Sequence, residues 1–283
     1  DQARAPWRCA AADGPRLADE TLTIGEHAWQ LADHTVRREG AGAITIGVIA
    51  DAGGAAAPTM AALGRLRAKL AEVDLVISLG GMGSTQAELE ATLGALADRA
   101  PWPIVAVPGD LESAADQVAA IAALRAKGQI VIDGRLARRI ELPGVTIATL
   151  PGSAFESRLV AGGDGCGYRA ADVERLLTEL TPRPGVRVLA SAEAPRITVE
   201  GEPAGELGLV PGASQEIDVA LHGPVSEAAS PARAGTRDGR ATPLSPGTAD
   251  ATIRLPGPRA STSAGLLTIT GRAWRWRPIA DID

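Results

Sequence analysis

The segment Ile46-Gly47-Val48-Ile49-Ala50-Asp51-Ala52-Gly53 is a short apolar run that ends in an aspartate and a glycine. Short apolar runs bounded by turn residues are typical of buried β-strands. Two similar runs follow, at residues 74–84 (DLVISLGGMGS) and 103–112 (PIVAVPGDLE), and both also end in glycine and polar residues. The three segments therefore predict buried strands that bring polar or glycine residues together at their ends.

Helical patterns separate and follow these runs. Pro58 suits the first turn of a helix that continues to about residue 73. The capping-box pattern Thr85-Gln86-Ala87-Glu88 predicts a helix to about residue 99, and Ser113 caps another to residue 126. Further strands are expected near residues 130–132, 137–142, 145–150, 186–193, 218–226 and 252–278, and a further helix over 170–180. Alternating strands and helices followed by late antiparallel strands predict two packed sheets flanked by helices.

Five strand-end segments resemble, in order and spacing, the calcineurin-like metallophosphoesterase family. That family carries the motifs D-x-H, G-D-x-x-D, G-N-H-E/D, a lone histidine and G-H-x-H at these positions. The resemblance covers about residues 44–278 and implies an α/β fold, a two-sheet β-sandwich flanked by helices (αββα). We expect an N-terminal arm with short β segments at residues 1–43. Residues 44–283 then form the metallophosphoesterase-like domain, with a long surface loop at about residues 225–250.

Most of the family's metal ligands are missing from this sequence. A two-metal hydrolytic site needs a bridging carboxylate and several imidazoles around its ions. The family's ligand positions fall on Asp51, Gly53, Gly81, Asp110, Ala192, Pro224 and Ser226, and its leaving-group histidine falls on Leu111. Only Asp51 keeps the family's residue. The sequence therefore predicts a pseudoenzyme with no catalytic residues and no metal cofactor.

Four carboxylates are expected near the degenerate pocket. They are Asp51, Asp110, Glu112 and Glu193. Because like charges raise one another's pKa, some must be protonated, paired with arginine, or bound to one divalent ion. An oxygen-only site would suit Mg²⁺ or Ca²⁺. The first alternative function is therefore a phosphoesterase with a relocated or single-ion site.

The loop Gly80-Gly81-Met82-Gly83-Ser84-Thr85 supports two interpretations. Backbone N–H groups at a helix N-terminus bind anions, so Gly81, Gly83, Ser84 and Thr85 are candidates for an anion loop. The second alternative function is a small-anion binding protein. Conversely, the glycines permit a tight turn and fill the space of the lost aspartate. The lysine of a P-loop is absent.

Composition restricts the partners of the chain. The net charge is −6 and the sequence has one Phe and one Tyr, which argues against nucleic-acid binding by a basic face or by base stacking. No apolar run approaches the ~20 residues of a transmembrane helix. The scaffold without metal ligands and the long decorated loop instead suggest a structural or binding subunit of an extracytoplasmic assembly, whose expected partner is another protein.

Cys9 and Cys166 both lie in irregular, loop-like sequence. An even pair in two loops is typical of a disulfide, although two buried free thiols are the alternative. A disulfide requires an oxidising compartment. The first residue, Asp1, fits a mature exported protein, and an upstream lipid anchor would fit equally. We therefore expect an extracytoplasmic bacterial protein, periplasmic or associated with the outer membrane, the bacterial source being suggested by heavy Ala, Gly and Arg usage.

Overall fold

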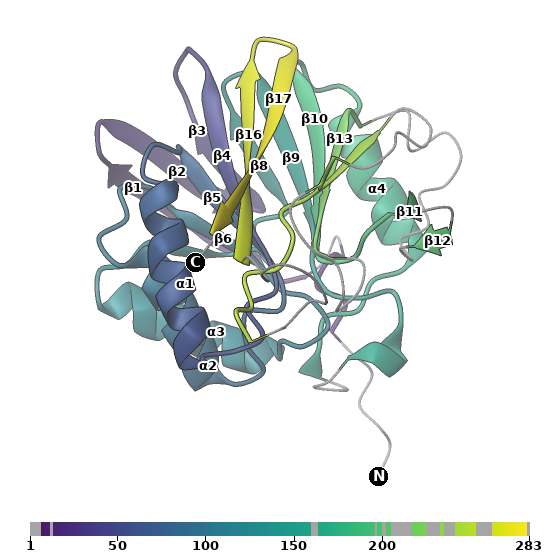
Figure 1. The fold of residues 1–283 in the computed structure, drawn as a ribbon. Helices are drawn as coiled ribbons and strands as arrows, with labels where there is room; N and C mark the ends of the chain where they lie inside the picture. The colour runs from purple at the N-terminus through teal and green to yellow at the C-terminus, as the bar shows by residue number, and fades with distance from the viewer. Residues whose placement is uncertain are drawn as a thin grey trace.

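Two stacked sheets with helices on both outer sides form the protein (Figure 1). The computed structural model describes residues 7–11, 14–159, 164–195, 197–199, 202–204, 217–224, 233–234, 241–252 and 262–281. Within these residues no helix is long and apolar enough to cross a membrane. The α/β sandwich flanked by helices that the sequence predicts is confirmed.

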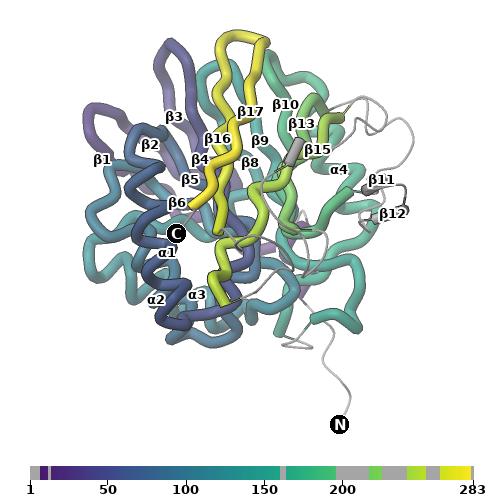
Figure 2. The backbone as a smooth tube through the Cα atoms, in the orientation of Figure 1, coloured from purple at the N-terminus to yellow at the C-terminus, as the bar shows by residue number. Residues whose placement is uncertain are grey.

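The six-stranded sheet has the order β17-β16-β4-β5-β6-β7. Its strands are Ala273–Asp281 (β17), Thr262–Thr270 (β16), Ile44–Ile49 (β4), Leu75–Leu79 (β5), Ile104–Val107 (β6) and Val131–Asp133 (β7). Strands β4 to β7 run parallel. Strand β16 pairs with β4 in the antiparallel sense and with β17, and this C-terminal hairpin is yellow in Figure 2. The outer face carries three helices, Ala57–Lys69 (α1), Gln86–Ala97 (α2) and Ala114–Ala126 (α3).

The nine-stranded sheet has the order β1-β2-β3-β8-β9-β10-β13-β15-β14. Its strands are Leu17–Ile24 (β1), His27–Asp33 (β2), Thr35–Arg38 (β3), Arg139–Leu142 (β8), Val145–Leu150 (β9), Val186–Ser191 (β10), Val219–His222 (β13), Thr242–Ser245 (β15) and Arg233–Ala234 (β14). Helix α4 (Ala170–Leu180) covers part of its outer face. A short 3-10 turn, Glu156–Arg158, and a small hairpin, Ile197–Val199 (β11) with Glu202–Ala204 (β12), complete the described elements.

Apolar side chains fill three layers. The largest cluster lies between the two sheets and takes fully buried residues from both, among them Ile46, Ile77 and Val188. A second cluster lies between the six-stranded sheet and helices α1 to α3, and a third lies under α4. Because both faces of β5 and β6 are covered, these strands are apolar throughout, which is the pattern expected for a covered parallel sheet.

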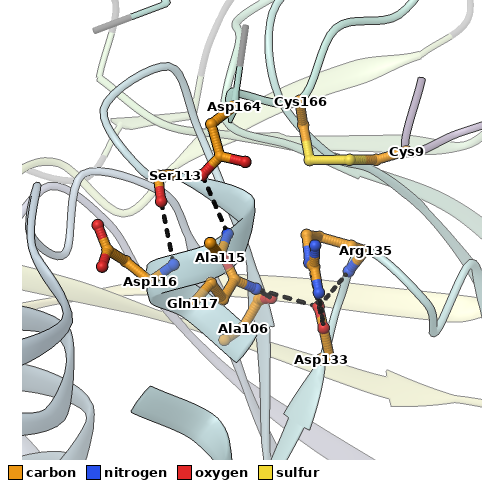
Figure 3. A network of polar contacts seen from close by, with 10 residues as sticks. All are labelled: Cys9, Ala106, Ser113, Ala115, Asp116, Gln117, Asp133, Arg135, Asp164 and Cys166. Carbon is orange, nitrogen blue, oxygen red and sulfur yellow. Dashed lines mark hydrogen bonds and ion pairs between the residues drawn. A yellow bond between two sulfur atoms is a disulfide. The ribbon is translucent and has the colours of Figure 1, made fainter. Parts of the chain in front are cut away.

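The helix starts agree with the capping residues in the sequence. The side chain of Thr85 accepts a hydrogen bond from Glu88 N–H at 3.3 Å. The Ser113 hydroxyl accepts one from Asp116 N–H at 3.0 Å (Figure 3). Helix α1 ends at Lys69, before the predicted residue 73, and α2 ends at Ala97 because the backbone becomes extended at the next residue.

The predicted surface loop at about residues 225–250 is wrong for its last ten residues. Strand β15 pairs in parallel with β13, and the side chain of Leu244 is fully buried. Ala249 is also buried, and its N–H group donates to the carbonyls of Ala50 and Asp51. Proline, glycine and serine there suggested an exposed turn, but long-range backbone bonds hold the segment in the interior. Residues 225–232 and 235–240 lie outside the described residues.

The expected N-terminal arm is largely part of the nine-stranded sheet. Strand β3 pairs in parallel with β8, and β1 and β2 extend the sheet beyond it. Further upstream, Trp7 N–H donates to the Gly165 carbonyl at 2.9 Å and the Trp7 carbonyl accepts from Gly167 at 2.7 Å. The arm therefore joins the sheet instead of standing apart from it.

Cys9 and Cys166 form the disulfide that their loop positions predict, with an S–S distance of 2.04 Å (Figure 3). The bond fixes the segment around Trp7 beside residues 164–167. The same segment is held by an ion pair of 2.7 Å between Arg8 and Asp172. The beginning of the described chain is thus attached both to a loop and to helix α4.

Replacing both cysteines by serine is expected to destabilise the fold. The cross-link joins positions 157 residues apart, so the chain-entropy model gives an upper value of about 5 kcal/mol. Denaturant unfolding of Cys9→Ser/Cys166→Ser, compared with the parent protein with and without reductant, measures the loss. The prediction would be contradicted if neither the two substitutions nor reduction of the parent protein changed the unfolding midpoint.

Candidate functional site

The ends of five strands meet at one place. After β4, the N–H of Asp51 donates to the Gly80 carbonyl, which follows β5, at 2.9 Å. A Cβ atom added at Gly80 would lie 2.7 Å from the Cα of Gly109 and 3.0 Å from the Cβ of Ala192. Gly223, after β13, donates to the Ala192 carbonyl at 3.1 Å. The family's motif positions are therefore brought together, and their backbones lie in direct contact.

The position of the family's bridging aspartate has no room for a side chain. Gly81 has a φ of +68°, and a Cβ atom added there would lie 2.8 Å from the Cα of Asp51. Gly53 has a φ of +63°, and its added Cβ would lie 2.2 Å from Oδ2 of Asp250. Left-handed backbone favours glycine at both positions. Hence the backbone of Asp51 occupies the space that a ligand at Gly81 would need, whereas at Gly53 the obstacle is the carboxylate end of the Asp250 side chain.

The carboxylate of Glu112 is buried at this junction. It accepts hydrogen bonds from Met82 N–H at 2.8 Å and from Gly109 N–H at 2.9 Å. Burial raises the pKa of Glu112 to about 7, because the charged form is poorly solvated; these two N–H groups oppose the shift. Glu112 thus joins the loop after β5 to the loop after β6.

The carboxylates of Asp110 and Glu193 have separate partners. Asp110 pairs with Arg158, with a distance of 3.7 Å between Oδ2 and Nε. Glu193 accepts hydrogen bonds from the hydroxyl groups of Ser153 and Tyr168. Asp51 lies against Gly81, and its carbonyl accepts from the Thr248 hydroxyl at 2.8 Å. In the described ranges no three His, Cys, Asp or Glu side chains form a group that could hold a metal ion.

His222 is buried at the end of β13. Its Nδ1 lies 2.7 Å from the Gly223 carbonyl, and burial lowers its pKa to about 4, against the effect of that bond. An uncharged imidazole directed at a backbone carbonyl is consistent with a structural role. Pro224 follows in the described chain, whereas the family position at Ser226 lies outside the described residues.

The glycine loop after β5 already binds carboxylates of its own chain. Met82 N–H donates to Glu112, and Ser84 donates to Glu88 through its N–H at 2.9 Å and its hydroxyl at 3.0 Å. These bonds hold the pKa of Glu88 below its ordinary value. An anion would have to displace Glu88 or Glu112 to use these N–H groups. Gly81, Gly83, Ser84 and Thr85 as an external anion site therefore stay a prediction.

Sequence reasoning missed several residues that complete the junction. Asp250 and Thr248 come from a segment whose composition suggested an exposed loop. Ser153 and Tyr168, which bind Glu193, lie on either side of residues 156–159. No local motif indicates these contacts, because each joins segments far apart in the chain.

A second buried polar group lies beside the junction, at the ends of β6 and β7 (Figure 3). Asp133 and Arg135 form a buried ion pair with a shortest distance of 2.6 Å. Gln117 of α3 donates to the Ala106 carbonyl at 2.9 Å and to Asp133 at 3.2 Å. Because the carboxylate of Asp133 is satisfied by Arg135 and Gln117, this group fixes α3 against the sheet.

Comparison with solved structures supports the same fold. The chain is similar to a purple acid phosphatase, PPD1 from yellow lupin (Lupinus luteus) seeds, with a TM-score of 0.52 and 10% identity over 89% of this chain and 56% of that one. It is also similar to GAP50, described as the anchor in the inner membrane complex of Plasmodium. That match has a TM-score of 0.51 and 9% identity over 84% of each chain.

A third solved structure aligns with a TM-score of 0.58 and 13% identity over 83% of this chain and 99% of its own. No protein-family model matches the sequence, and no curated protein matches it either. At these identities the likeness concerns the fold alone. The chain therefore has the metallophosphoesterase fold.

Restoring the family's aspartate at Gly81 is expected to destabilise the protein without creating a metal site. A side chain at Gly81 meets Asp51 in a left-handed backbone, whereas Gly128 has a similar φ of +79° and no atom within 4 Å of an added Cβ. Gly81→Asp should therefore lose about 2 kcal/mol or more beyond Gly128→Asp, since overpacking costs about 1–3 kcal/mol. Chemical denaturation of the two variants measures the difference. Equal losses, or a Gly81→Asp variant stabilised by Mn²⁺, would contradict this prediction.

Glu112 and His222 predict opposite pH dependences of stability. The pKa of Glu112 rises on folding from 4.5 to about 7. Its contribution to the free energy of unfolding is therefore complete below pH 4.5 and is lost as the pH rises to 7. The pKa of His222 falls from 6.5 to about 4, so its contribution is present above pH 6.5 and is lost as the pH falls to 4. In the parent protein the two slopes oppose one another.

Single variants should separate these slopes. Between pH 4.5 and 6.5, the free energy of unfolding of Glu112→Gln is expected to rise with pH relative to the parent. That of His222→Gln should fall with pH relative to the parent. Each difference is on the order of 3 kcal/mol at most, since one pKa unit corresponds to about 1.4 kcal/mol. Glu156→Gln, in the exposed 3-10 turn, is the control, and parallel curves for all four proteins would be the contrary result.

Proposed function

We propose that this protein is a pseudoenzyme, a metallophosphoesterase fold that acts as a structural or binding subunit instead of hydrolysing phosphoesters. The observation that supports this proposal most directly is the contact between Gly81 and Asp51. A Cβ atom added at Gly81 would lie 2.8 Å from the Cα of Asp51. A missing ligand can be replaced by another side chain. The space for a side chain at Gly81 cannot be regained unless the loops after β4 and β5 separate.

The rest of the junction supports the same proposal. A catalytic two-metal site needs an open, polar cavity in which ions lie ~3.5–4 Å apart. Here Glu112 is 2% exposed and bonded to two backbone N–H groups, and Glu193 is bonded to two hydroxyl groups. These carboxylates already serve the fold, so recruiting them to a metal would require breaking the contacts that hold the loops.

A location outside the cytoplasm and a role in an assembly complete the proposal. The Cys9–Cys166 disulfide is the kind of bond that persists in oxidising compartments. A neighbour of the same fold, GAP50, is described as an anchor in a membrane complex. That description concerns the Plasmodium protein, and it supports the proposal by showing that the fold can have an anchoring role.

Metal content and phosphatase activity test the central part of the proposal. Protein purified without chelator is analysed for bound metals and assayed on p-nitrophenyl phosphate with added Mn²⁺ or Mg²⁺. The expected result is no stoichiometric metal and no turnover above that of the Asp51→Ala variant. Turnover that requires Asp51 would establish the alternative, a phosphoesterase with a relocated or single-ion site. Phosphate bound without metal, and lost in a Ser84→Ala/Thr85→Ala variant, would favour the anion-binding alternative.

A further inference from the structure

Among the described residues, helix α4 packs on the outer face of the nine-stranded sheet over β9, β10 and β13, and not over the hairpin β1–β2. Its apolar side chains pack over β9 and β10, on residues such as Ala148 and Leu189. In Figure 1, α4 lies beside β10 and β13, away from the hairpin β1–β2. On that hairpin the outward residues Thr21, Thr23, Ala28, Gln30 and Ala32 are all exposed. We call the outer surface of β1, β2, β3 and β8 the open face.

The pairing of the strands places the exposed residues of the open face in one row with a cluster of arginines. Across the strands, Thr21 is paired with Gln30, Gln30 with Arg37, and Arg37 with Glu141. Partners in register point to the same side of a sheet. Arg37 and Glu141 therefore lie in one row with the exposed threonine and glutamine, at the border between the open face and the part of the sheet that α4 covers.

Three guanidinium groups surround the single carboxylate of Glu141. The distances to its oxygens are 2.5 Å from Arg37, 2.9 Å from Arg139 and 3.2 Å from Arg183, which follows α4. Burial disfavours the charged form of Glu141, but the hydrogen bond from Arg37 and the charges of the three arginines hold its pKa below its ordinary value. We call these four residues the arginine cluster.

The arginine cluster has an excess of positive charge on an acidic protein. Three guanidinium groups against the carboxylate of Glu141 leave two positive charges in the cluster, and Glu39 beside it reduces the local excess to one, whereas the whole chain carries −6. The three arginine side chains remain 45%, 26% and 34% exposed. Beside them lies an open basin of about 460 Å³, lined in part by Arg37, Glu39 and Pro143. Arginine with delocalised charge is the residue most suited to binding carboxylates at interfaces.

We propose that the open face, with the arginine cluster at its border, binds an acidic segment of a partner protein. This inference rests on the proposed function as a binding subunit and names the surface and the partner chemistry. Small side chains such as Thr23, Ala28 and Ala32 allow close approach of a polypeptide. The face lacks exposed large apolar side chains that would enter a lipid bilayer, so a protein partner is favoured over a membrane surface.

The size of the open face sets the size of the partner element. The four strands have eight, seven, four and four residues. At about 3.4 Å per residue and about 4.8 Å between strands, they give a surface on the order of 400 Å² in projection. A standard stable interface buries about 800 Å² on each partner. The face therefore accommodates one extended or helical segment carrying carboxylates, and the arginines supply specificity and electrostatic attraction.

Binding of a fluorescent octaglutamate peptide tests this inference. Fluorescence anisotropy at low salt is expected to show binding that weakens at least about tenfold in Arg37→Gln/Arg183→Gln. Glu141→Gln should bind more tightly, because it removes the opposing negative charge. Arg272→Gln/Arg275→Gln, with the same charge change on exposed residues of the β16–β17 hairpin, is the matched control and should bind like the parent. Thermal unfolding confirms that each variant is folded.

Three results would overturn the inference. The first is no saturable binding of the peptide by the parent protein. The second is peptide binding that is weakened equally in the β16–β17 control variant, which would mean general electrostatic attraction without a defined binding site. The third is preference for inorganic polyphosphate or for vesicles of anionic lipid over the peptide. None of these results affects the metal and turnover measurements, so a failure of this inference can be told apart from a failure of the proposed function.

Discussion

The hydrogen bonds to Glu112 are the interaction on which the closed junction depends. One carboxylate accepts an N–H group from the loop after β5 and another from the loop after β6. These bonds bring Gly80 and Gly109 into van der Waals contact, with Ala192 of the other sheet against both. A buried carboxylate without such partners would cost several kcal/mol. The burial of Glu112 and the closeness of the loops therefore require each other.

The contacts at the junction connect the strand ends directly. In a two-metal enzyme the ions neutralise carboxylates and hold several strand ends together. Here backbone contacts, Asp250 against Gly53, and bonds from Thr248 and Ala249 to Asp51 connect these strand ends. The disulfide attaches the segment of Cys9 to a loop near the same end of the molecule. Under the proposed function, the surface that binds a partner lies away from this junction, on the open face.

The sequence predicted the elements more completely than the contacts of the site. Apolar runs such as Leu75–Leu79 and capping residues such as Thr85 act locally, so strands and helix starts could be predicted within a few residues. The emptied ligand positions at Gly53 and Gly81 were also visible as residue types. By contrast, the binding of Glu193 by Tyr168 and the contact of Asp250 with Gly53 arise from long-range packing, which composition does not encode. Strand β15 was mistaken for loop because its proline and serine signal turns locally.

The most direct test of the account is a crystal structure of protein grown with millimolar Mn²⁺, with anomalous data collected at a wavelength where manganese scatters strongly. A closed junction gives no anomalous peak among Asp51, Asp110 and Glu193, with Met82 and Gly109 still donating to Glu112 and Asp250 still against Gly53. A manganese peak coordinated by Asp51, with the loops after β4 and β5 moved apart, would contradict it.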